Sequence, residues 1–70
     1  MEALVRSDLK GWSIPATWQV SKRNFREVYL WAKDLKGSKV MSESDIGMCK
    51  IRLKDKRIVM VDSIDLDFKG

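Results

Sequence analysis

The chain contains no histidine, a single cysteine (Cys49) and only four glycines, which are scattered at positions 11, 37, 47 and 70. Without histidine, the most common general base and metal ligand of proteins is absent, and one cysteine cannot build a zinc site. Scattered glycines do not make a phosphate-binding loop. We therefore expect a protein that is not an enzyme, with no catalytic residues, metal or cofactor, and with Cys49 as a buried apolar residue.

Long hydrophobic runs are missing as well. The first residues lack the apolar core of a secretory signal peptide, and no segment approaches membrane-spanning length. The lone cysteine excludes an internal disulfide, which fits a reducing compartment. The 70 residues are near the lower limit for a domain without disulfides or metals. The sequence thus predicts a single small domain over residues 1–70, cytoplasmic and without a membrane partner.

What the chain does carry is positive charge, concentrated in its middle. Residues 1–20 are balanced, whereas residues 21–57 hold eleven Lys or Arg against five Asp or Glu. Residues 58–70 hold one lysine against three aspartates, and the whole chain has a net charge of +4. A basic segment of this kind favours an anionic partner such as a nucleic acid.

Residues 21–37 have the most regular pattern in the chain. At 100° per residue, all but one of the apolar side chains from Phe25 onward fall on one helical arc of roughly 160°, with the basic side chains opposite. Ser21 suits an N-cap, and Gly37 suits the left-handed residue that ends a helix. The pattern predicts an amphipathic helix over residues 21–36.

The same segment also fits a strand. Residues 27–33 would then be buried on both faces, and residues 34–37 would form a hairpin turn, because Asp first and Gly fourth suit a type I turn. The tetrapeptide Asp-Leu-Lys-Gly also occurs at residues 8–11, which supports this second interpretation.

Strict alternation of apolar and polar residues predicts strands elsewhere. Residues 12–20 alternate cleanly, although Pro15 places that strand at an edge or interrupts it. Residues 50–54, 57–61 and 64–68 would form an antiparallel meander, with a two-residue turn at Asp55 and Lys56. Residues 3–7 and 12–14 would pair if residues 8–11 turn. Residues 38–48 fit a loop with one helical turn starting at Ser42.

These elements predict an α+β fold, in which one amphipathic helix packs on a small antiparallel sheet in a layout resembling a winged helix. The alternative is an all-β, SH3-like small barrel, in which residues 26–33 and 38–41 form a hairpin around residues 34–37.

Two basic clusters are candidate nucleic-acid contacts. The first, on the expected helix, consists of Lys22, Arg23, Asn24, Arg26 and Lys33. The second, on the expected wing, consists of Lys50, Arg52, Lys54, Lys56 and Arg57. A solvated helix face, or an edge strand protected by lysines, would give the same patterns.

The run Val-Ser-Lys-Arg-Asn-Phe at residues 20–25, with Trp31 following, resembles the start of the second helix in small helix-turn-helix, excisionase-like phage regulators. The resemblance implies a recognition helix followed by a short wing. It also implies that Lys22, Arg23, Asn24 and Arg26 would read the DNA.

The sequence therefore predicts non-catalytic binding of nucleic acid, preferentially duplex DNA, by a small regulator or accessory factor of phage or bacterial type. The alternative is a protein-interaction module or self-associating subunit that pairs through the acidic last strand, residues 64–68.

Overall fold

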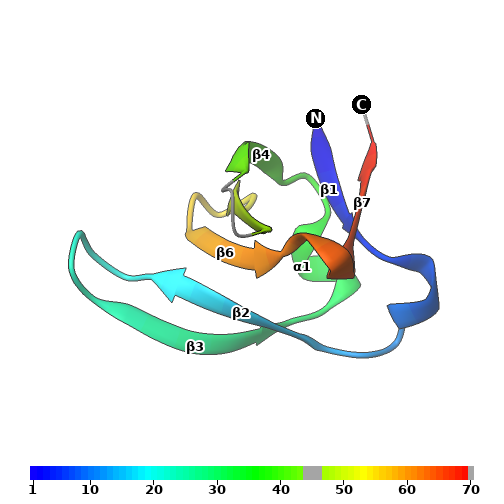
Figure 1. Ribbon diagram of the computed structural model, residues 1–70, viewed down its shortest axis with the longest axis horizontal. Coiled ribbons are helices and arrows are strands. Elements are labelled where there is room, and N and C mark those ends of the chain that lie inside the picture. The colour runs from blue at the N-terminus through cyan, green and yellow to red at the C-terminus, as the bar shows by residue number, and fades with distance from the viewer. Residues whose placement is uncertain (44–46, 70) are drawn as a thin grey trace.

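The computed structural model describes residues 1–43 and 47–69, and it shows an antiparallel β fold (Figure 1). Its seven described strands are β1 (Glu2–Val5), β2 (Ile14–Gln19), β3 (Phe25–Leu30), β4 (Lys39–Glu43), β5 (Met48–Arg52), β6 (Ile58–Asp62) and β7 (Leu66–Lys69). The helical elements are short: η1 (Ser7–Leu9), α1 (Ala32–Leu35) and η2 (Ser63–Asp65). None of the described helices is long and apolar enough to cross a membrane.

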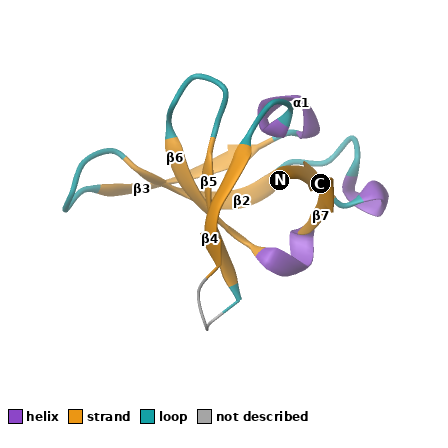
Figure 2. Ribbon diagram, turned by 90° about the horizontal axis from the view of Figure 1, so that it is seen from above, coloured by secondary structure: helices purple, strands orange, loops and turns teal. Residues whose placement is uncertain are grey.

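The strands form two sheets. Five strands pair in the order β3-β2-β6-β5-β4, and β1 pairs with β7 so that the two ends of the chain lie side by side (Figures 1 and 2). A backbone hydrogen bond joins the sheets, because the Val40 amide of β4 donates to the Met1 carbonyl, next to β1, at 3.0 Å. Within the small sheet, the Arg6 amide donates to the Asp65 carbonyl at 2.9 Å and extends the β1–β7 pairing by one position.

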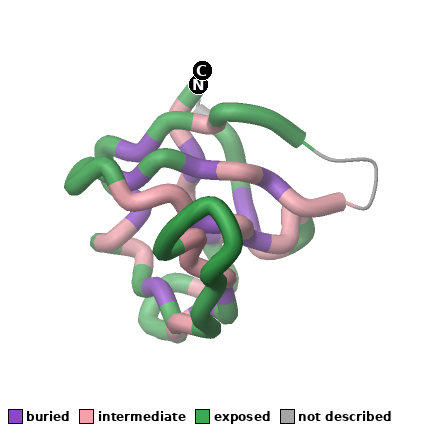
Figure 3. The backbone as a smooth tube through the Cα atoms, turned by 90° about the vertical axis from the view of Figure 1, so that its left-hand side faces the viewer, coloured by how far each residue is buried: buried purple, intermediate pink, exposed green. Residues whose placement is uncertain are grey.

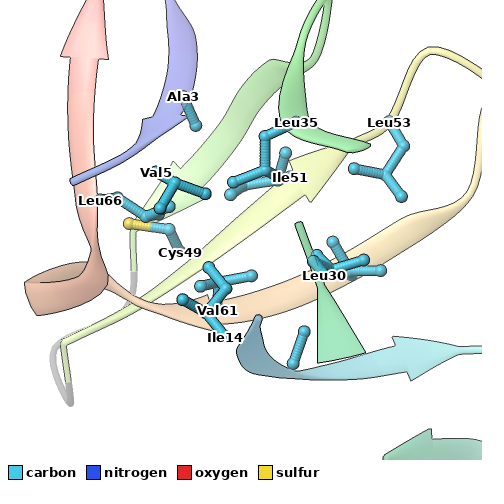
Figure 4. Packing of buried hydrophobic residues seen from close by; sticks show 12 residues of the cluster. Ala3, Val5, Ile14, Leu30, Leu35, Cys49, Ile51, Leu53, Val61 and Leu66 are labelled. Atoms are coloured by element: carbon cyan, nitrogen blue, oxygen red, sulfur yellow. The ribbon is translucent and has the colours of Figure 1, made fainter. Parts of the chain in front are cut away.

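Alternation builds the core. Cys49 and Ile51 of β5 point into the core (Figure 4). In register, Cys49 is opposite Val61 of β6 and Ile51 is opposite Val59, so two buried cross-strand pairs pack side by side. In the part of the chain that the structure describes, twelve apolar residues are buried together: Ala3, Val5, Ile14, Ala16, Leu30, Leu35, Cys49, Ile51, Leu53, Val59, Val61 and Leu66. Leu35 is the buried residue of α1 and is fully shielded from solvent, so this single helical turn packs against the core through Leu35.

The predicted amphipathic helix is wrong. Residues 25–30 are strand β3, which pairs with β2 over its whole length, and only Ala32–Leu35 is helical. A helix would bury Phe25, Tyr29 and Trp31 together, yet their side chains are 50%, 70% and 46% exposed. Aromatic residues favour strands. In addition, β3 pairs with β2 at six successive positions, and a helix over these residues would lose all of these cross-strand contacts.

The winged-helix layout is therefore wrong as well, and so is the recognition helix that the resemblance implied. The fold belongs to the all-β class of the alternative prediction, but the hairpin of that alternative is absent. Residues 26–30 pair with β2, and residues 39–43 pair with β5. The expected hairpin of residues 3–7 and 12–14 is also wrong, because β1 pairs with β7.

The repeated Asp-Leu-Lys-Gly tetrapeptide has a shared local structure. Each copy ends a short helical turn, η1 or α1, and each glycine has a positive φ, +91° at Gly11 and +79° at Gly37. Glycine adopts this left-handed conformation without a steric penalty, so both copies let the chain leave the turn sharply.

The strands predicted from alternation are found as β2, β5, β6 and β7, although residues 64–65 belong to η2 and not to a strand. The predicted three-stranded meander is wrong, because β5 pairs with β6 but β7 leaves this sheet and pairs with β1. Residues 39–43 form β4 instead of the predicted loop. The helical turn predicted from Ser42 extends into residues 44–46, which lie outside the described part of the chain.

The turn between β5 and β6 is longer than the predicted two-residue turn. The Leu53 amide donates to the Arg57 carbonyl at 2.8 Å, and Lys56 has a φ of +74°. This left-handed conformation costs a residue with a side chain about 1–2 kcal/mol.

We expect Lys56→Gly to raise the free energy of unfolding by about 0.5–1 kcal/mol, since glycine relieves the strain but adds entropy to the unfolded chain. Urea denaturation measures the change. Lys36→Gly is the control. Lys36 has a φ of −63°, so glycine relieves no strain there and this variant should be less stable than the unmodified protein. A loss of stability in Lys56→Gly would contradict the prediction.

Cys49 is fully buried, as predicted, and burial raises the pKa of its thiol. The folded protein should therefore react with a disulfide reagent far more slowly than the urea-unfolded protein, measured by absorbance of the released thiol. The thiol's contribution to stability should be present below its ordinary pKa and lost as pH rises through the raised value. Equal rates in the folded and unfolded states would refute this prediction.

Candidate nucleic-acid interface

The β2–β3 hairpin extends away from the rest of the molecule (Figure 1). Its turn is closed at both ends of the loop by backbone hydrogen bonds. The Val20 amide donates to the Asn24 carbonyl at 2.9 Å, and the Asn24 amide donates to the Ser21 carbonyl at 3.3 Å. Every residue from 20 to 27 is exposed, and the end of the hairpin faces the viewer in Figure 3.

Positive charge is concentrated at this hairpin tip, which we define as residues 20–26. Lys22, Arg23 and Arg26 lie there, and the next acidic residue is Glu27. Val20 and Phe25 flank the turn with side chains that are 42% and 50% exposed. The first predicted cluster is thus held together in part, but on a β-ribbon instead of a helix.

The remaining member of that cluster, Lys33, lies elsewhere. It belongs to α1, which is fixed in part by the Trp31 amide donating to Asp34 Oδ2 at 2.7 Å. Lys33, Lys36 and Lys54 line a common hollow of about 480 Å³, which brings α1 next to the β5–β6 turn (Figure 2). We call these three residues the lysine triad. Lys36 was not among the predicted contacts, although its position three residues after Lys33 could have indicated it.

The Arg57 side chain contacts Asp55 in the same turn and Trp18 of β2. Its Nε atom donates to Asp55 Oδ2 at 2.6 Å, and its guanidinium lies 5.6 Å from the centre of the Trp18 ring. The Arg57 backbone amide, followed by its guanidinium, lowers the pKa of the Asp55 carboxyl. Arg57 therefore joins the β5–β6 turn to Trp18 of β2, which is paired in register with Arg26 of the hairpin tip.

The other predicted contacts lie on the outer face of the sheet or in the turn. Lys50 and Arg52 alternate with buried residues of β5, and Arg52 is paired in register with Lys39 of β4. Lys56 is exposed in the turn. The second predicted cluster is thus divided between the turn, which joins the lysine triad, and the outer face of β5.

These exposed cations and ring systems can bind phosphate groups and can contact bases. Among the described residues, no group of three or more Cys, Asp or Glu is placed to hold a metal ion. Comparison with known proteins does not identify a relative. No family model, curated protein or solved structure matches this chain significantly. The assignment of function therefore rests on the geometry of the basic surface.

Proposed function

We propose that this protein binds nucleic acid without catalysis, preferentially duplex DNA, as a small cytoplasmic regulator or accessory factor of bacterial or phage type. The observation that carries the proposal is the protruding hairpin tip, with three cations and no acid among residues 20–26. The major groove of DNA, about 12 Å wide, admits a two-stranded β-ribbon.

Two contacts would hold the duplex. Lys22, Arg23 and Arg26 would reach phosphates or base edges along a groove, and the lysine triad would neutralise phosphates beside it. Asn24 closes the hairpin through its backbone and keeps its exposed amide side chain for hydrogen bonding to a base.

The test is titration of the protein into a fluorescently labelled DNA duplex at several salt concentrations. We expect the affinity to fall by at least tenfold between about 50 and about 200 mM salt, because each neutralised phosphate releases counterions. Amide chemical shifts of residues 20–26 should move on addition of DNA. If no salt-sensitive binding to DNA or RNA occurs at low ionic strength, the proposal is wrong.

Self-association is a second candidate, favoured by exposed apolar side chains near the last strand. Ile64 and Phe68 are 67% and 38% exposed, although β7 already uses one edge to pair with β1. Sedimentation velocity separates the two functions. A salt-insensitive dimer that fails to bind DNA would support self-association.

A further inference from the structure

A groove opens on the outer face of the five-stranded sheet, where β2 separates from β6. These strands pair at Thr17 with Met60 and at Trp18 with Val59. Continuing that register would place Pro15 opposite Asp62, but proline has no amide hydrogen to donate. The ladder stops, and a cavity of about 390 Å³ lies along the gap. We call it the outer groove.

The walls of the outer groove are largely apolar and adaptable. Tyr29 of β3 stands beside its partner Pro15, and its side chain is 70% exposed. Met60 of β6 and Met48 of β5 contribute the facing wall. Methionine side chains adjust to varied ligand shapes, and an exposed aromatic ring next to a cavity attracts cations over its face.

The charge of the outer groove is opposite to that of the whole protein. Among the residues that the structure describes, Glu27 and Asp62 are the charged ones that line the groove, and neither Lys nor Arg lines it, although the chain carries a net charge of +4. Thr17 of β2 is paired with Glu27 of β3 on one side and with Met60 of β6 on the other. Asp62 lies two residues beyond Met60 on β6. Asp62 also accepts the Ile64 amide through Oδ1 at 3.2 Å, which fixes its carboxylate. Lys50 faces Met60 across the β5–β6 ladder but does not line the groove.

We propose that the outer groove binds a lysine or arginine side chain presented by an extended, basic segment of a partner protein. The aliphatic stem would lie between Tyr29 and Met60, and the cationic end would meet the carboxylates of Glu27 and Asp62. The same carboxylates repel phosphate, so this site is separate from the hairpin tip and does not depend on the proposed DNA binding.

The test is a titration of the ¹⁵N-labelled protein with two short unstructured peptides that differ only in carrying lysine or glutamate. We expect the lysine peptide to shift the amides of Thr17, Glu27, Tyr29 and Met60, and the glutamate peptide to leave them unchanged. The double variant Glu27→Gln, Asp62→Asn should bind the lysine peptide about tenfold more weakly, because two partly exposed charge contacts are lost.

Single variants locate the bound peptide within the groove. Asp62→Asn retains the side-chain oxygen that accepts a hydrogen bond from the Ile64 amide. The single variant Glu27→Gln removes one carboxylate of the groove and leaves this hydrogen bond unchanged. Asp67→Asn removes an exposed acid on β7, outside the groove, and should bind the lysine peptide normally. Tyr29→Phe should retain binding, whereas Tyr29→Ala should weaken it.

Four outcomes would overturn the proposal: unchanged affinity in both Glu27 variants, equal binding of the glutamate peptide, shifts confined to β7, or groove shifts that depend only on protein concentration. The last would identify a second copy of the chain as the occupant. Failure here is distinguishable from failure of the DNA proposal, because the variants of Glu27 and Asp62 should still bind DNA.

Discussion

Replacing Lys22, Arg23 and Arg26 together with alanine is expected to weaken binding to a DNA duplex about a hundredfold at low salt. Three phosphate contacts would be lost, so the slope of log affinity against log salt should become shallower by about 2 to 3. The three side chains are exposed, and the hydrogen bonds that close the turn are between backbone groups, so the fold should be unaffected. Fluorescence anisotropy over a salt series measures both quantities.

The matched control for the hairpin tip is replacement of the lysine triad, Lys33, Lys36 and Lys54, by alanine. Both triple variants remove three positive charges, so a purely non-specific charge effect would lower the two affinities equally. We expect the hairpin variant to lose more, because it would enter a groove. Equal losses would show that the hairpin has no special role, and no loss in either variant would contradict the whole interface. Arg57 is unsuited to this comparison, because removing it also breaks its contacts with Asp55 and Trp18.

Ile51→Ala is expected to cost about 2–5 kcal/mol of stability. Ile51 is fully buried on β5, an interior strand of the sheet, directly opposite Val40 on β4 and Val59 on β6. Truncation removes buried methyl groups and leaves a cavity that neighbouring strands cannot close. A domain of this size has roughly 4–10 kcal/mol in total, so a substantial fraction of the variant should be unfolded at elevated temperature.

The control is Ile64→Ala, which makes the same chemical change at a side chain that is 67% exposed. It should alter the free energy of unfolding by less than about 0.5 kcal/mol in a urea titration followed by tryptophan fluorescence. If the two variants have similar midpoints, the buried position of Ile51 is wrong.

The strands of the last third were predictable because burial there follows the alternation of the sequence. In β5 and β6, inward residues are apolar, and the outward side of β5 carries Lys50 and Arg52. A single strand does not reveal its partner, so the pairing of β1 with β7 was not predictable.

The helix predicted over residues 21–36 failed, and the alternative strand over residues 27–33 is right only for residues 27–30 and wrong in being buried on both faces, because the apolar residues of β3 do not follow burial. Phe25 and Tyr29 are exposed on the hairpin and Leu30 is buried, so an apolar count imitates one face of a helix. The helical turn at α1 depends on Leu35 reaching the core, which local propensity does not encode.

Of the two candidate sites, the hairpin tip could be predicted from the sequence and the outer groove could not. Charge alone predicts Lys22, Arg23 and Arg26 as nucleic-acid contacts, and the structure changes the element that carries them from a helix to a hairpin. The outer groove could not have been predicted, because Glu27 and Asp62 belong to strands that are not neighbours in the sheet. Pro15 predicted a strand that lies at an edge or is interrupted, but β2 runs through Pro15 without a break, and it is the pairing with β6 that stops before this residue.

The pairing of β1 with β7 has a consequence for folding during translation. Glu2–Val5 is synthesised more than sixty residues before Leu66–Lys69, so the small sheet cannot form until its second strand has left the ribosome. The β2–β3 hairpin consists of neighbouring segments and can form much earlier. Until β7 arrives, the apolar side chains of Ala3 and Val5 lack their partner strand, so a nascent chain stalled before Leu66 should depend on chaperones more than the finished protein does.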